Sequence, residues 1–229
     1  MFPPFEASTW HLLTRLGEAQ IVLPVLLLSL GWLLVRRDDR RLVACWLAVV
    51  AVAVAITLAT KVAFIGYGLG VPALNFTGVS GHAMFAALVY PLLACLLTAS
   101  RPTWLRRSAV LACVGLAVVV AVSRVMVGAH SASEVVAGFA LGSLACVAAL
   151  AMARRPATKL PMWLPLGLAL WLGITPAHAP ASNTHGAVTR LALAVSGRAH
   201  PYTRHEMLRD WQRQQRRERD QAVAPPGTG

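Results

Sequence analysis

Five apolar runs of membrane-spanning length constrain this chain more than any other feature. They are Ala19–Val35, Leu42–Thr60, Ala83–Thr98, Ser108–Val127 and Glu134–Ala153. A helix needs about 20 mostly apolar residues to cross roughly 30 Å of hydrocarbon, so each run predicts a transmembrane helix. The whole chain is 57% hydrophobic and 13% charged, whereas a soluble domain averages about 25% charged residues. The composition therefore favours a membrane protein over a water-soluble domain.

A sixth run, Leu160–Ile174, is shorter and contains Pro161 and Pro165. It is expected either to span or to lie at the membrane interface. The chain is thus predicted to be all-α, a polytopic membrane helical bundle of five to six transmembrane helices. The four cysteines lie inside apolar runs without metal-like pairing, which indicates buried free thiols and neither a disulfide nor a zinc framework; they are Cys45, Cys95, Cys113 and Cys146.

The polar segments divide the chain into three regions. Residues 1–18 are predicted to be an interfacial N-terminal segment, residues 19–175 the transmembrane domain, and residues 176–229 a polar, basic C-terminal tail. The tail contains a charged helix expected over Arg204–Gln221. Because this tail carries eight arginines between Arg190 and Arg219, while six spans would place it outside the cell, its side of the membrane stays open.

The net charge of +12 comes mainly from basic clusters in every second connection between spans and from the tail. The clusters are Arg36, Arg37, Arg40, Arg41; Arg101, Arg106, Arg107; and Arg154, Arg155, Lys159. Such placement predicts cytoplasmic loops and contact with anionic lipid headgroups, with no nucleic acid partner. The expected location is the inner (plasma) membrane, with residues 61–82 and 128–133 facing the periplasm or exterior. Nothing in the sequence indicates an oligomeric state.

Ionisable residues are rare near the spans, and those at the predicted outer ends are candidate functional groups. They are Lys61, His82, Arg124, His130 and Glu134, and Glu134 is the sole acidic residue between Arg40 and His205. An arginine and a lysine suit an anion with several oxygens, such as a phosphoryl group. Two histidines supply a nucleophile and an acid for its transfer.

Two local sequence patterns, a predicted helix start and a four-residue spacing, add further groups to this set. Ser80 and Gly81 lie at a predicted helix start, where free backbone N–H groups and the helix dipole favour phosphate. Glu134 follows His130 by four residues, so both lie on one helical face and the carboxylate can orient the imidazole. The set predicts phosphoryl transfer without a metal or another cofactor.

Three motifs resemble those of the type 2 phosphatidic acid phosphatase superfamily, which includes membrane lipid phosphatases and undecaprenyl pyrophosphate phosphatases. They are Lys61; Val79-Ser80-Gly81-His82; and Ser123-Arg124-Val-Met-Val-Gly-Ala-His130-Ser-Ala-Ser-Glu134. The resemblance implies that His130 forms a phosphohistidine, that Glu134 orients it and that His82 is the general acid. Lys61, Ser80, Gly81 and Arg124 would hold the phosphate. Undecaprenyl pyrophosphate is the first implied substrate and a phosphatidate-type lipid the next.

The chain departs from the superfamily pattern at three positions. No arginine occurs between Lys61 and His82, valine replaces proline before Ser80, and Glu134 stands where aspartate is usual. One phosphate-binding arginine of the pattern is therefore missing from its expected place.

Other interpretations of the same residues stay open. Ser131 and Glu134 fit a capping box, and Ser80 fits a simple N-cap. Lys61 and Arg124 could be interfacial anchors. Gly78-Val79-Ser80-Gly81 also resembles the motif of rhomboid-type intramembrane serine proteases, with Ser80 as nucleophile and His130 as its base. A non-catalytic lipid-phosphate binder or transporter is the remaining alternative.

Overall fold

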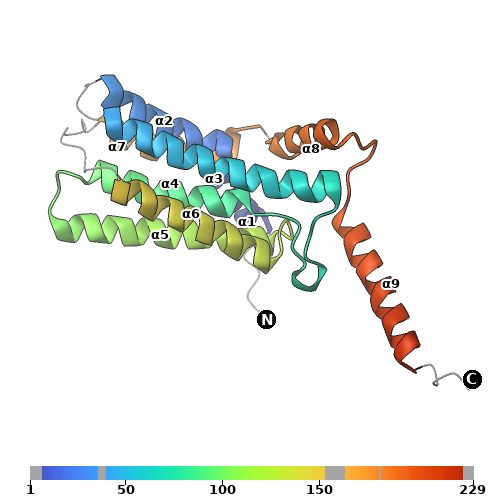
Figure 1. Cartoon of the computed structure of the whole chain (residues 1–229). Coiled ribbons are helices and arrows are strands. Elements are labelled where there is room, and N and C mark those ends of the chain that lie inside the picture. Colours follow the sequence, from blue (N-terminus) through green and yellow to red (C-terminus); the bar gives the residue numbers. More distant parts are fainter. Residues whose placement is uncertain (1–6, 36–39, 153–162, 181, 224–229) are drawn as a thin grey trace, which may run out of the picture.

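The described residues of the computed structural model fold into helices, in agreement with the predicted all-α class. The structure describes residues 7–35, 40–152, 163–180 and 182–223. The helices are α1 (Ala7–Arg15), α2 (Ala19–Val35), α3 (Arg40–Tyr67), the short 3₁₀ helix η1 (Pro72–Leu74), α4 (Gly81–Leu97), α5 (Thr103–Met126), α6 (Ala132–Met152), α7 (Trp163–His178), α8 (Thr184–Ser196) and α9 (Arg204–Val223). Figure 1 shows α2–α7 side by side as one bundle.

Helix α4 lies at the centre of this bundle and packs against α2, α5 and α6. Most of its residues are buried, including Met84, Leu88 and Leu92, because apolar residues fill nearly every position around the helix. A helix that is apolar all round is stable only when other helices or lipid surround it. The N-terminal end of α4 is therefore fixed by neighbours on several sides, and that end carries His82.

Two glycines allow α6 to approach α4 closely. A Cβ atom at Gly138 would collide with the carbonyl oxygen of Ser80, and one at Gly142 would collide with that of Met84. Gly138 and Gly142 are four residues apart on one face of α6, the small-residue spacing that brings membrane helices into backbone contact. The backbone at Ser80 is thereby held against the first turns of α6, where Glu134 lies.

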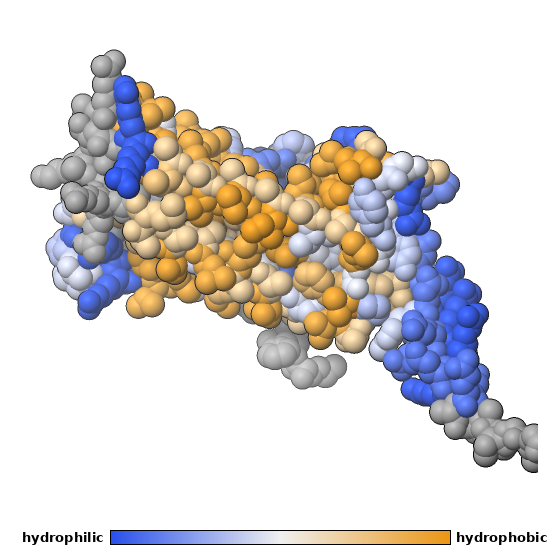
Figure 2. Space-filling view, in the orientation of Figure 1, coloured by the Kyte–Doolittle hydropathy of each residue, from blue (hydrophilic) through white to orange (hydrophobic). Residues whose placement is uncertain are grey.

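The surface of the bundle fits a membrane environment. Figure 2 shows an apolar surface along the sides of the bundle and hydrophilic residues at its ends and along α9. Within the described part of the chain, four stretches are long and apolar enough to cross a membrane, namely Ser8–Val35, Arg40–Tyr67, Thr103–Met126 and Ala132–Met152, and α4 is a shorter apolar helix.

The sixth predicted run forms α7, which runs antiparallel to α2. Trp163 packs edge-on against Trp32, with ring centroids 5.2 Å apart, and Trp171 Nε1 donates a hydrogen bond to the carbonyl of Ile21 at 3.1 Å. These contacts lie near the two ends of α2, so α7 follows the bundle from one end to the other. Residues 160–162 of this run lie outside the described residues, as do the cluster residues Arg36, Arg37, Arg154, Arg155 and Lys159.

Part of the polar tail packs against the end of the bundle. Helix α3 continues past the predicted end at Thr60 to Tyr67, and α8 packs along it. A small apolar cluster joins these elements to the start of α9; its buried members are Phe64, Ile65, Ala192 and Met207. Helix α9 then points away from the bundle (Figure 1).

Candidate active site

One end of the bundle encloses a cavity of about 1080 Å³ that contains most of the predicted site residues. Lys61, Gly81, His82, Arg124 and His130 all line it. They come from α3, α4, α5 and the loop before α6, so the helix ends meet as predicted. Ser80 and Glu134 lie behind this lining, and both residues are completely buried.

The carboxylate of Glu134 is the centre of a hydrogen-bond network. Oε2 is 2.7 Å from His130 Nδ1 and accepts from the backbone N–H of Ser131 at 3.1 Å. Oε1 accepts from the backbone N–H of Thr77 at 2.7 Å and from its hydroxyl at 2.5 Å. Because these groups donate to it, Glu134 acts as an ionised acceptor, the form that a buried carboxylate adopts when it is paired.

Glu134 also caps its own helix. The Glu134 N–H points to Ser131 Oγ at 3.4 Å while the Glu134 carboxylate accepts from the Ser131 N–H, which is the reciprocal arrangement of a capping box. The same Oε2 atom binds His130. The capping role and the role beside His130 are therefore compatible, and one carboxylate serves both.

The hydrogen bond to Glu134 determines the protonation pattern of the His130 ring. A carboxylate accepts only, so Nδ1 carries the proton and Nε2 keeps a free lone pair. Burial lowers the pKa of His130 below its usual value of 6.5; the hydrogen bond to Glu134 opposes this, and the positive charges of Lys61 and Arg124 lower it further. His130 is thus a neutral imidazole near pH 7, as a nucleophile requires.

Arg124 is oriented by a contact that the sequence did not predict. Its Nη1 donates to Thr14 Oγ1 of α1 at 2.8 Å, and its buried Nε has no hydrogen-bond partner among the described residues. An unpaired buried guanidinium N–H is costly unless an anion supplies the acceptor. Arg124 is therefore poised to bind an anion in the cavity, near the imidazole of His130.

The sequence predicted that free backbone N–H groups at the start of α4 bind phosphate, but the Ser80 N–H is not free. The Ser80 N–H donates to the Glu134 carbonyl at 3.1 Å, so it is already occupied, and Ser80 makes no side-chain capping bond. Gly81, the first residue of α4, lines the cavity. Among the described residues the buried Ser80 Oγ has no hydrogen-bond partner, and His130 Nδ1 is already bound to Glu134. The contact that a Ser80–His130 protease pair requires is absent from these residues.

Sequence reasoning missed Thr14, Thr77 and Arg204. Arg204, the first residue of α9, places Nη2 2.7 Å from Glu134 Oε2 and 2.8 Å from Oε1. Its signal was indirect, since no arginine occurs between Lys61 and His82 while the tail has many. Thr77 lies 57 residues from Glu134 in sequence, and no periodicity could have paired them.

Comparisons with known proteins agree with the motifs. The family model described as the PAP2 superfamily matches residues 58–158, a stretch that contains every predicted site residue. A protein of Klebsiella pneumoniae described as "Uncharacterized 22.5 kDa protein in cps region" is 31% identical over 202 residues, which cover 86% of this chain and 97% of that protein. No solved structure matches the chain.

Proposed function

This chain belongs to the PAP2 superfamily of membrane-type phosphatases, and from that premise we propose that it hydrolyses a lipid-linked phosphate or pyrophosphate through a phosphohistidine. The observation that carries the proposal is the hydrogen bond between His130 Nδ1 and Glu134, 2.7 Å long, at the wall of a cavity that also holds two cations and a second imidazole. This combination supplies a neutral nucleophile beside a binding site for an anion.

Each group has a role in the proposed reaction. His130 Nε2 attacks phosphorus, an N–P bond forms, and the bond from phosphorus to the leaving oxygen breaks while His82 protonates that oxygen. Lys61 and Arg124 neutralise the phosphoryl oxygens. His82 then takes a proton from water, which attacks phosphorus, releases inorganic phosphate and regenerates His130. Glu134 stabilises the imidazolium character that develops on His130.

The apolar part of the cavity supports a lipid as the bearer of the phosphate. Leu23 of α2, Val54 and Leu58 of α3, and Phe85 of α4 line the same cavity as the polar groups. A hydrocarbon chain can bury its surface there while the phosphate reaches the charged end. Undecaprenyl pyrophosphate is the first choice and a phosphatidate-type lipid the second; both come from the superfamily resemblance.

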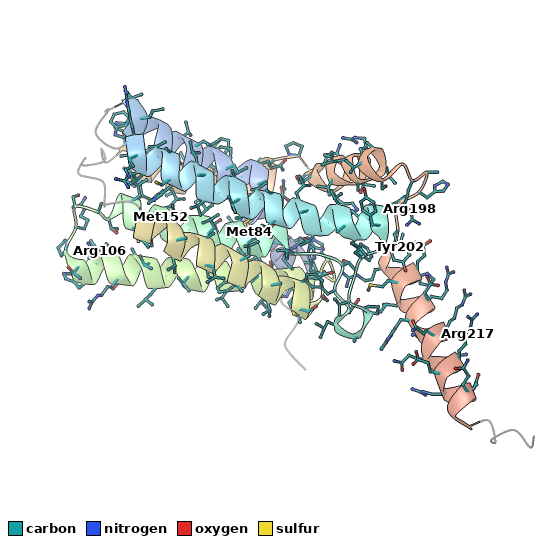
Figure 3. All side chains as sticks on the ribbon, in the orientation of Figure 1. Met84, Arg106, Met152, Arg198, Tyr202 and Arg217 are labelled. Atoms are coloured by element: carbon teal, nitrogen blue, oxygen red, sulfur yellow. The ribbon has the colours of Figure 1, made fainter. Side chains whose placement is uncertain are left out.

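The distribution of charge supports a site at the outer face of the inner membrane. Arg40 and Arg41 begin α3, and Arg101, Arg106 and Arg107 lie at the junction of α4 and α5. The other end of α3 carries Lys61, which lines the cavity, and Figure 3 shows Arg106 at the end of the bundle far from Tyr202, another residue of the cavity lining. Positive residues mark the cytoplasmic side, so the cavity would face the periplasm or exterior.

Purified, detergent-solubilised protein tests the proposal with a panel of lipid monophosphates and diphosphates. We expect release of inorganic phosphate by the wild type and none by the His130→Ala variant. Saturable lipid binding without phosphate release would instead identify a non-catalytic binder or transporter. Wild-type rates in the His130→Ala variant would exclude the phosphohistidine scheme.

A further inference from the structure

The start of α9 is built into the wall of the catalytic cavity. Arg204 lines that cavity, and its Nη2 lies between both oxygens of Glu134 at 2.7 and 2.8 Å. The Glu134 side chain is completely buried, whereas that of Arg204 is 33% exposed. The guanidinium therefore covers the carboxylate from the solvent side, and the polar tail reaches the residue that orients His130.

Further contacts fix the Arg204 guanidinium. Nη1 donates to Asn75 Oδ1 at 3.1 Å and to the Asn75 carbonyl at 3.4 Å, and Nη2 is 3.3 Å from Thr77 Oγ1. Asn75 adopts a left-handed conformation with φ of 51°, which asparagine tolerates better than most residues. The guanidinium thus bridges Glu134 and the loop that supplies Thr77.

The backbone around Arg204 is held on both sides. Upstream, the Tyr202 N–H donates to the Ile65 carbonyl at 2.9 Å, and the Tyr202 ring packs against Phe64 with centroids 5.5 Å apart. Figure 3 shows Tyr202 where α9 leaves the bundle and Arg217 far along the helix. Downstream, Met207 is buried in the same apolar cluster. Only the first turn of α9 is anchored by these contacts.

A capping box fixes the first turn itself. The Thr203 N–H donates to the Glu206 carboxylate at 2.7 Å, and the Glu206 N–H points to Thr203 Oγ1 at 3.3 Å. This reciprocal pair determines where α9 begins and in which direction its first residue projects. That first residue is Arg204, so local sequence and tertiary packing agree on its position.

We infer that Arg204 is a positioning residue that holds Glu134, and through it His130, in the reactive arrangement. The inference rests on the proposed function, but it assigns a role to the C-terminal tail, which lies outside the residues matched by the family model. Arg204 contacts the carboxylate and does not need to contact the substrate. Its loss should therefore lower kcat and leave KM nearly unchanged.

The experiment is a double-mutant cycle on phosphate release with Arg204→Gln, Glu134→Gln and the double variant. We expect Arg204→Gln to lower kcat about 10- to 100-fold, because it removes charge-assisted hydrogen bonds, with KM changed by less than about threefold. We expect the double variant to be no slower than Glu134→Gln alone, since Arg204 acts through that carboxylate. Arg213→Gln is the matched control, because Arg213 is an exposed arginine of the same helix.

Each other outcome counts against the inference. A raised KM with effects that multiply in the double variant would make Arg204 a direct substrate ligand. An unchanged kcat in Arg204→Gln would show that Arg204 has no role in turnover. If Arg204→Gln does not fold, Arg204→Lys carries the same cycle, since one ammonium keeps the charge but cannot bridge both oxygens and Asn75. A wild type that releases no phosphate from any lipid would overturn the proposed function, and this inference with it.

Discussion

Replacing Gly17 with alanine should displace His82 while every predicted site residue keeps its identity. Gly17 is a buried residue between α1 and α2. A Cβ atom there would lie 2.8 Å from His82 Cβ, 2.8 Å from a methyl carbon of Val120 and 3.0 Å from the His82 carbonyl oxygen. Carbon atoms prefer separations of about 3.5–4.0 Å, so the added methyl requires a movement of about 1 Å.

This movement should lower both the stability of the protein and its catalytic rate. Overpacking a well-filled site destabilises a protein by about 1–3 kcal/mol, so the variant should fold with a lower thermal midpoint. A misplacement of about 1 Å at a catalytic group costs up to 10²-fold in rate. Since His82 and Val120 share the displacement, we expect kcat on an alkyl phosphate to fall about 10- to 100-fold.

The assay compares two leaving groups. An alkoxide leaving a lipid phosphate needs a proton from His82, whereas the nitrophenolate of p-nitrophenyl phosphate leaves without one. His82 also activates water in the second step, which both substrates share, so the comparison uses the pre-steady-state release of the leaving group, which reports the first step alone. Gly17→Ala should reduce that first-step rate strongly on the lipid phosphate and by less than about threefold on the aryl ester. Gly31→Ala is the control, because no atom of the described residues, apart from the adjoining backbone of its own helix, lies within 4 Å of the Cβ position there. An equal loss on both substrates, or no loss at all, would refute the reasoning.

Three further predictions follow from the site. Because burial holds the pKa of His130 below 6.5, the acid limb of the pH profile of kcat/KM should have its midpoint below that value, and Glu134→Gln should move this limb lower still; an acid-limb midpoint above 7 would contradict this. Thr14→Ala removes the neutral partner of Arg124, so KM for a lipid phosphate should rise about 2- to 10-fold, whereas an unchanged KM would show that Arg124 needs no support from α1. Hydrolysis should keep its full rate after dialysis against a chelator, and loss of activity restored by a divalent cation would disprove metal independence.

The hydrophobic pattern predicted the helices well, except where their ends leave the membrane. The run Ala19–Val35 has the same bounds as α2. Helix α3 continues seven residues beyond the predicted end at Thr60, because Phe64 and Ile65 pack beneath the C-terminal elements. This packing involves residues far along the chain, so the local hydrophobic pattern does not predict it.

In the site, too, the sequence predicted a contact between residues close in the chain and missed a contact between distant ones. The pairing of His130 with Glu134 follows from a four-residue spacing on one turn, and the structure brings the two side chains together. The contact between Arg204 and Glu134 joins positions 70 residues apart. The basic composition of the tail predicted only a polar segment that contacts anionic lipid headgroups, yet the capping box at Thr203 and the buried Met207 hold the first turn of α9 against the bundle.

The central claim is that His130 carries the phosphoryl group during turnover. The most direct measurement is to mix purified protein with a lipid phosphate labelled at phosphorus, stop the reaction in alkaline denaturant and map the labelled peptide by mass spectrometry. We predict an acid-labile phosphate on His130 in the wild type and none at this position in His130→Ala. An active wild type with no such adduct, or with the label on Ser80, would contradict the account.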